Sequence, residues 1–147
     1  MDVAWANARP VQRRKAGATF YKCALQVNPK GYAAQFRGET VEKTESYTKE
    51  IITKCLELKI QAIGITNHND FGDVPEFQRL AAGSGITVFP GFELSSSEGV
   101  HLLCLYPPET QSEQLRLNLG NLGIARSGPS DDLSTMNLNQ ILSKVAS

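Results

Sequence analysis

The chain has 147 residues, of which 41% are apolar and 20% are charged, and its formal net charge is zero. This length suits one domain with a real core, and the composition argues against a wholly disordered chain or a membrane protein. The charge is unevenly spread: residues 1–60 carry 11 Lys and Arg against 6 Asp and Glu, and residues 61–147 carry 4 against 9. The basic first part is a weak sign of a phosphate-rich partner, and solvated faces of opposite sign are the simpler explanation.

The first 17 residues combine basic side chains with little apolar periodicity. Arg13, Arg14 and Lys15 stand together in this stretch, which also lacks an apolar segment of signal-peptide length. We interpret residues 1–17 as a basic arm and Arg13, Arg14 and Lys15 as candidate nucleic-acid contacts. The three cysteines of the chain lie in apolar contexts without C-x-x-C spacing, which predicts reduced, buried thiols and a cytoplasmic protein.

Residues 18–147 are predicted to form one α/β domain, because short apolar runs alternate with amphipathic stretches. The first strand is expected at residues 20–27, followed by a polar loop at 30–43 and the clearest helix at 45–58, whose apolar residues recur at three- and four-residue steps. The remaining elements follow in the order strand 60–66, helix 74–82, strand 86–89, a turn at Pro90-Gly91, strand 100–106, helix 109–119, loop 120–136 and helix 137–146. This order predicts mainly parallel strands in an open sheet or a partial barrel. A helix at the end with no strand after it suggests part of a larger protein.

Polar side chains with metal-binding chemistry lie at the ends of three of these strands. His68 follows the second strand, Glu93 lies beyond the third, and His101 opens the fourth. Each has an ordinary explanation: His68 sits in a turn-forming Asn-His-Asn-Asp sequence, Glu93 suits a salt bridge or cap, and His101 suits a buried neutral histidine. Together, however, two imidazoles and a carboxylate are ligands that zinc, manganese and iron prefer. Three such ligands with an open position predict a hydrolytic metal site that acts on phosphoryl groups.

Short motifs around these residues resemble the PHP (polymerase and histidinol phosphatase) domain family. Residues 63–70, IGITNHND, resemble its ITDHD motif, residues 91–95, GFELS, its G-x-E motif, and residues 101–106, HLLCLY, its H-h-L-x-Y strand. Residues 20–29 occupy the place of its opening DLHxHT strand. The resemblance is closest to the N-terminal modules of TrlF-type proteins, which carry an AAA or SMC-like ATPase region. It implies a distorted β/α barrel of PHP type, with a metal site at the C-terminal ends of the strands.

Several motif positions depart from the family pattern. Gln26 and Asn28 stand where the opening motif has its two histidines, and Ala24 and Asn67 stand where the family has aspartates. Neutral amides are weak ligands for a catalytic metal cluster. The later AH and D-x-H motifs of the family are absent from these 147 residues.

Two functions therefore remain open. The resemblance carries over His68, Glu93 and His101 as metal ligands, with Asp70 as a catalytic group that accepts a hydrogen bond from a ligand or water. On that basis the chain is a metal-dependent phosphoesterase or nuclease using Zn, Mn or Fe. The favoured alternative is a degenerate module with lost or reduced catalysis, associated with DNA or RNA and with an ATPase region of its own or a partner chain, as in phage-defence or DNA-processing proteins.

Overall fold

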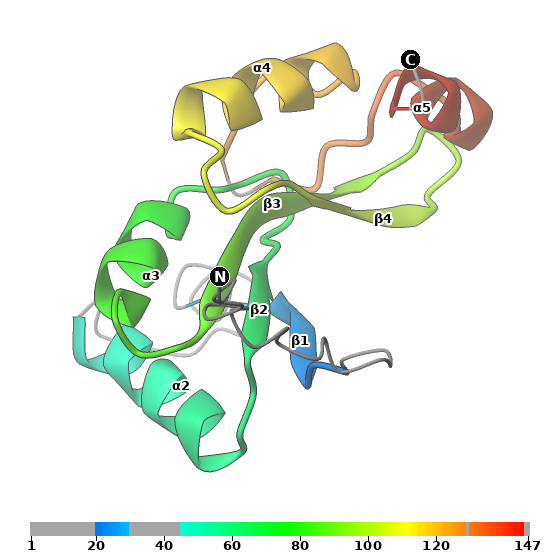
Figure 1. The fold of residues 1–147 in the computed structure, drawn as a ribbon. Coiled ribbons are helices and arrows are strands. Elements are labelled where there is room, and N and C mark those ends of the chain that lie inside the picture. Colours follow the sequence, from blue (N-terminus) through cyan, green and yellow to red (C-terminus); the bar gives the residue numbers. More distant parts are fainter. Residues whose placement is uncertain (1–19, 30–44, 129, 146–147) are drawn as a thin grey trace, which may run out of the picture.

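A curled, four-stranded sheet forms the centre of the computed structural model, which describes residues 20–29, 45–128 and 130–145 (Figure 1). The strands lie in the order β1, β2, β3, β4. Their bounds are β1 Cys23–Val27, β2 Ala62–Ile65, β3 Thr87–Ser95 and β4 His101–Leu105. β1, β2 and β3 run parallel, and β4 is antiparallel to β3. The sheet is thus a half-barrel with mostly parallel strands, which confirms the predicted α/β class and partial PHP-type barrel.

The described residues contain four helices beside the sheet, and their bounds are α2 Glu45–Glu57, α3 Val74–Ala81, α4 Ser112–Asn121 and α5 Leu138–Val145. Helices α2 and α3 contact each other, and α3 contacts β3. Figure 1 shows α4 near the opposite end of β3 from α2, and α5 beyond the sheet, next to the start of β4. No helix in the described part of the chain is long and apolar enough to cross a membrane.

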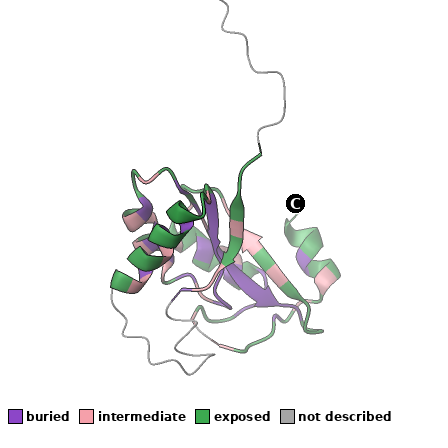
Figure 2. Ribbon diagram, turned by 90° about the horizontal axis from the view of Figure 1, so that it is seen from below, coloured by how far each residue is buried: buried purple, intermediate pink, exposed green. Residues whose placement is uncertain are grey.

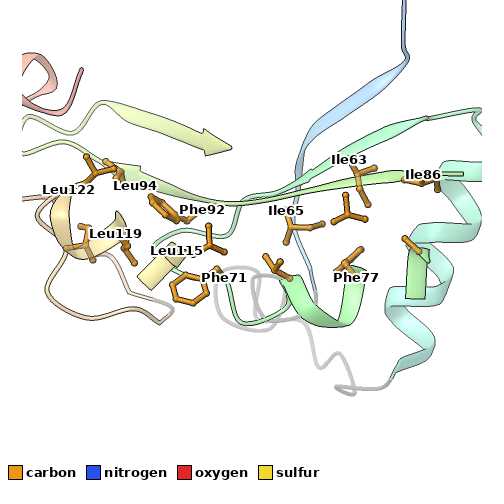
Figure 3. Packing of buried hydrophobic residues seen from close by; sticks show 14 of the residues in the cluster. Ile63, Ile65, Phe71, Phe77, Ile86, Phe92, Leu94, Leu115, Leu119 and Leu122 are labelled. Carbon is orange, nitrogen blue, oxygen red and sulfur yellow. The ribbon is translucent and has the colours of Figure 1, made fainter. Parts of the chain in front are cut away.

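The hydrophobic core lies on one face of the sheet, which we call the helix-covered face. Ile63 and Ile65 of β2 and Phe92 and Leu94 of β3 are fully buried there (Figure 3). They pack with Phe77 of α3 in one continuous cluster. Because successive side chains of a strand point to opposite faces, the intervening residues lie on the other side, which we call the open face.

β3 differs from the prediction at Pro90-Gly91, where a turn was expected and the strand instead continues to Ser95. At this point β3 changes partner: Pro90 is the last residue paired with β2, and Gly91 is the first paired with β4. Pro90 still accepts a hydrogen bond from the backbone N–H of Tyr106 at 2.9 Å. A side chain on Gly91 would collide with the backbone oxygen of Cys104. Glycine is therefore needed for the close approach of β4, not for a turn.

The other elements agree with the prediction to within a few residues. β1 begins three residues later than expected, at Cys23, and α4 begins at Ser112 instead of residue 109. The arm at 1–17 and the loop at 30–43 lie outside the described residues. All three cysteines are free, but Cys23 is exposed, so the prediction of buried thiols is wrong for this residue. The reason is its position on the outer strand of the described sheet, which Figure 2 shows as largely exposed.

Candidate functional site

The structure brings His68, Glu93 and His101 to the same end of the sheet. The chain just after β2 continues to pair with β3, so that His68 lies beside Glu93. The backbone N–H of Glu93 donates to the carbonyl of Asn67 at 2.9 Å, and the N–H of Asn69 donates back to the carbonyl of Glu93 at 2.7 Å. The antiparallel turn to β4 then places His101 opposite Ser95. The rings of His68 and His101 have their centres 5.8 Å apart.

Glu93 is a buried carboxylate, and two side chains of the described residues contact it. Its Oε1 accepts a hydrogen bond from Nδ1 of His101 at 2.7 Å. Its Oε2 lies 3.4 Å from Nε2 of Gln26, which is a longer and weaker contact. A buried carboxylate is costly unless it is paired in this way. Glu93 is therefore held between the start of β4 and the end of β1.

His101 itself is not buried, contrary to the expectation from its apolar strand. Its side chain is 63% exposed. β4 pairs only with β3 among the described strands, so its open-face side chains have no neighbouring strand beyond them. Leu103, on the same strand and face, is also 43% exposed.

His68 is buried, and both of its ring nitrogens have partners. Nδ1 lies 2.7 Å from the backbone carbonyl oxygen of Ser130, and Nε2 lies 3.0 Å from Oγ of Ser95. A carbonyl oxygen only accepts hydrogen bonds, so Nδ1 carries the proton. In the neutral ring Nε2 then holds the lone pair and accepts a hydrogen bond from the Ser95 hydroxyl.

Residues 130–134 lie beside this end of the sheet, where Leu133 pairs with Ser95, and we call them the strap. Asn69 holds the strap with its side-chain amide, which donates to the carbonyl of Asp132 at 2.8 Å and to Ser130 at 3.2 and 3.3 Å. Asn69 is fully buried and has a left-handed backbone, with φ of 54°. The backbone N–H of Ser134 donates to the carbonyl of Ser95 at 2.7 Å, which attaches the strap to β3 as well.

The remaining predicted positions have local roles. The Asn67 amide donates to Asp73 at 3.1 Å, just before α3. Asp70 accepts a hydrogen bond from the backbone N–H of Gly72 at 3.1 Å, which is ordinary turn chemistry. Ala24 packs against the core on the helix-covered face. Asn28 is half-buried and follows the end of β1. Arg13, Arg14 and Lys15 lie outside the described residues.

As arranged, these side chains do not fit a metal centre. No group of three or more His, Cys, Asp or Glu side chains in the described part of the chain is placed to hold a metal ion. The His68 lone pair is occupied by Ser95, and Glu93 by His101. Three buried amide oxygens, Oδ1 of Asn28, Asn67 and Asn69, have no hydrogen-bond donor among the described residues. They are neutral oxygen donors, which suit transition metals poorly.

Sequence reasoning missed the two serines that hold His68. Ser95 opens a run of three serines between two strands, and nothing in that run marks a contact with His68. Ser130 lies 62 residues from His68 in a Gly, Ser and Asp-rich stretch. A contact through a backbone carbonyl leaves no signal in residue type, so only the fold could show it.

Comparison with known proteins gives the family. No curated protein matches the chain. The family model of the PHP domain matches residues 40–122, which is more than half of the chain. The matched segment runs from before α2 to just after α4, and it includes His68, Glu93 and His101. The half-barrel and the strand-end position of these residues agree with that match, and the chain belongs to the PHP domain family.

Proposed function

We propose that this chain is a PHP domain in which hydrogen bonds between protein groups take the place of the metal centre, and that it serves as a binding module with lost or reduced catalysis. PHP domains generally bind divalent metals. The proposal depends on one observation: the side-chain atoms that would bind a metal already form contacts with other groups of the protein. Both nitrogens of His68 are bonded to serines, and both oxygens of Glu93 contact side chains.

The neutral residues at the motif positions support the same conclusion. Gln26 contacts Glu93 from the position where the family motif has an imidazole, and it donates a hydrogen bond there. An amide N–H cannot ligate a metal, whereas an imidazole nitrogen can. Asn67 is likewise turned to Asp73 at the start of α3. These substitutions replace ligands by hydrogen-bond donors.

The metal content of the purified chain tests this proposal directly. We expect well under one equivalent of Zn, Mn or Fe by elemental analysis, with no difference between the wild-type protein and a His68→Ala variant. Near-stoichiometric metal in the wild type that disappears in His68→Ala would overturn the proposal. Circular dichroism of both proteins shows whether the variant is folded.

We further propose that the module associates with DNA or RNA within an ATPase-linked protein of TrlF type, in a DNA-processing or phage-defence role in the cytoplasm. The support is the TrlF-like motif pattern, the basic group Arg13, Arg14 and Lys15, and the three free cysteines. Replacing these three basic residues by alanine should weaken binding to labelled DNA and reduce its salt dependence, as measured by fluorescence anisotropy. Unchanged binding at every salt concentration would count against this role of the arm.

A metal-dependent phosphoesterase or nuclease is the second candidate function. The specific observation in its favour is the 5.8 Å spacing of the His68 and His101 rings beside Glu93. Two imidazoles on one tetrahedral zinc ion have ring centres roughly 5 Å apart. Hydrolysis of bis-p-nitrophenyl phosphate and of DNA, assayed with Zn²⁺, Mn²⁺ and Fe²⁺, tests this candidate. Activity that depends on the added ion and is lost in Glu93→Gln would establish it.

A further inference from the structure

We propose that Ser95 decides whether this domain takes up a metal, because its hydroxyl competes with a metal ion for the lone pair on Nε2 of His68. This inference rests on the proposed function, since it explains why a PHP site that keeps two histidines and a glutamate is closed by hydrogen bonds. It assigns a role to Ser95 and, as a positioning group, to the backbone carbonyl of Ser130.

The strap sets His68 in the tautomer that a metal would need. The carbonyl of Ser130, 2.7 Å from Nδ1, holds the ring proton on that nitrogen. Metal-bound histidines commonly donate their second ring N–H to a carbonyl in the same way. The lone pair of His68 is thus on Nε2, the nitrogen that lies 3.0 Å from the Ser95 hydroxyl. Ser130 prepares His68 for a ligand, and Ser95 is the group that occupies the prepared position.

The distance between the imidazoles is not the obstacle to a shared metal. Their 5.8 Å spacing is close to the roughly 5 Å expected for two histidines on one zinc ion. Glu93 lies next to both, paired with His68 along the backbone and bonded to His101 through Oε1. His101 is largely exposed, so its ring has room to turn, and a metal ion would then replace it as the partner of the Glu93 carboxylate. Besides the longer contact of Glu93 with Gln26, the buried bond between Ser95 and His68 then remains.

Ser95 cannot easily move out of the way. It is 3% exposed and belongs to β3, where it pairs with His101 of β4. Its carbonyl accepts a hydrogen bond from the N–H of Ser134, so the strap fixes it from the other side. Backbone pairing on both flanks therefore fixes the Ser95 main chain beside Nε2 of His68. A metal ion would have to break a buried hydrogen bond and leave the hydroxyl without that partner.

The test is zinc affinity in the full chain, measured by competition with a chromophoric chelator. Ser95→Ala removes the hydroxyl and frees the lone pair, and we expect it to bind Zn²⁺ about tenfold more tightly than the wild type. Ser95→Thr keeps a hydroxyl and should bind as weakly as the wild type. Ser97→Ala is the matched control, because Ser97 is exposed two residues away and its hydroxyl contacts Glu98. It should leave zinc affinity unchanged.

A second measurement determines the tautomer of the His68 ring in the metal-free wild-type protein. Long-range ¹H–¹⁵N NMR of the His68 ring should show a protonated Nδ1 and an unprotonated Nε2, and an Nε2–H tautomer would overturn the inference. Equal zinc affinity in Ser95→Ala and the wild type, with both folded, would overturn it as well. Neither result would restore a metal to the wild type, so the proposed function would stand. Stoichiometric metal in the purified wild type would instead overturn both.

Discussion

On the helix-covered face of the sheet the buried side chains are apolar and pack without directional bonds, whereas at the strap end of the open face the buried side chains are polar and bonded to specific partners. Ile63 and Phe92 represent the first region, and His68 and Asn69 the second. Both regions are closed to solvent, but they gain stability differently. Apolar packing depends on volume, and a polar cluster depends on each donor meeting its acceptor.

The difference between apolar packing and polar bonding indicates which part of the domain can change its chemistry without losing the fold. A core residue is constrained by the size of its neighbours, so its sequence pattern stays recognisable. A polar site can exchange one partner for another of similar shape, as a metal ligand for a hydrogen-bond donor, with the fold intact. Under the function proposed above, Gln26 beside Glu93 is such an exchange. The family fold and the family chemistry can therefore separate at this end of the sheet.

The largest effect is expected in the helix-covered face. Phe92→Ala would leave a cavity between β3 and the helices, because Phe92 is fully buried. We expect it to lower the free energy of unfolding by about 3–5 kcal/mol, measured by urea denaturation. Leu103→Ala, on the open face of β4, should cost about 1 kcal/mol or less, since Leu103 is 43% exposed. Equal losses in the two variants would show that the open face is covered in solution.

The polar region should respond strongly to loss of one donor. Asn69→Ala removes the amide that holds Ser130 and Asp132, and it places alanine in a left-handed backbone. We expect a loss of about 2–3 kcal/mol in unfolding free energy, with faster amide hydrogen exchange confined to the strap. Asn69→Gly separates the two causes, because glycine tolerates the backbone but supplies no amide. Exchange that stays slow at the strap in both variants would contradict the assigned role of Asn69.

The junction between the two regions is Gly91, where β3 changes partner. A methyl group there would meet the backbone oxygen of Cys104 and a methyl of Leu105. We expect Gly91→Ala to cost about 1–3 kcal/mol in thermal or urea unfolding, because a backbone atom cannot move aside. Gly120→Ala, in helix α4 with nothing near the added methyl, should instead stabilise by about 0.5–1 kcal/mol. A neutral Gly91→Ala would mean that β4 does not approach β3 this closely.

Most of the fold could be predicted because its signals are local. Helix α2 and strand β2 were found from apolar periodicity and from short apolar runs, and the structure places both within two residues of the prediction. The prediction failed at Pro90-Gly91, where two turn-forming residues instead serve a strand that changes partner. The position of β4 beside β3 explains why Pro90 and Gly91 lie within a strand. No local sequence pattern predicts that position.

The site was predictable only in part, for a similar reason. His68, Glu93 and His101 could be found because polar residues at the ends of buried strands are conspicuous, and the structure does bring them together. Their partners could not be found, because Ser130 acts through a backbone carbonyl. Such partners decide whether a side-chain atom that could bind a metal is already hydrogen-bonded. The sequence therefore predicted which side chains meet at this end of the sheet and left their partners open.

The smallest expected effect concerns two thiols, the half-buried Cys104 and the exposed Cys23. Burial raises the pKa of Cys104 from 9.0 to about 11. Because the unfolded thiol loses its proton first, the stability from this group is complete below about pH 9 and is lost as the pH rises from 9 to 11. The urea midpoint of the wild type should fall more steeply over that range than that of Cys104→Ala. Because burial disfavours the Cys104 thiolate, iodoacetamide at pH 8 should modify the exposed Cys23 first. Parallel pH profiles for the two proteins, or early labelling of Cys104, would mean that the helix-covered face opens readily beneath β4.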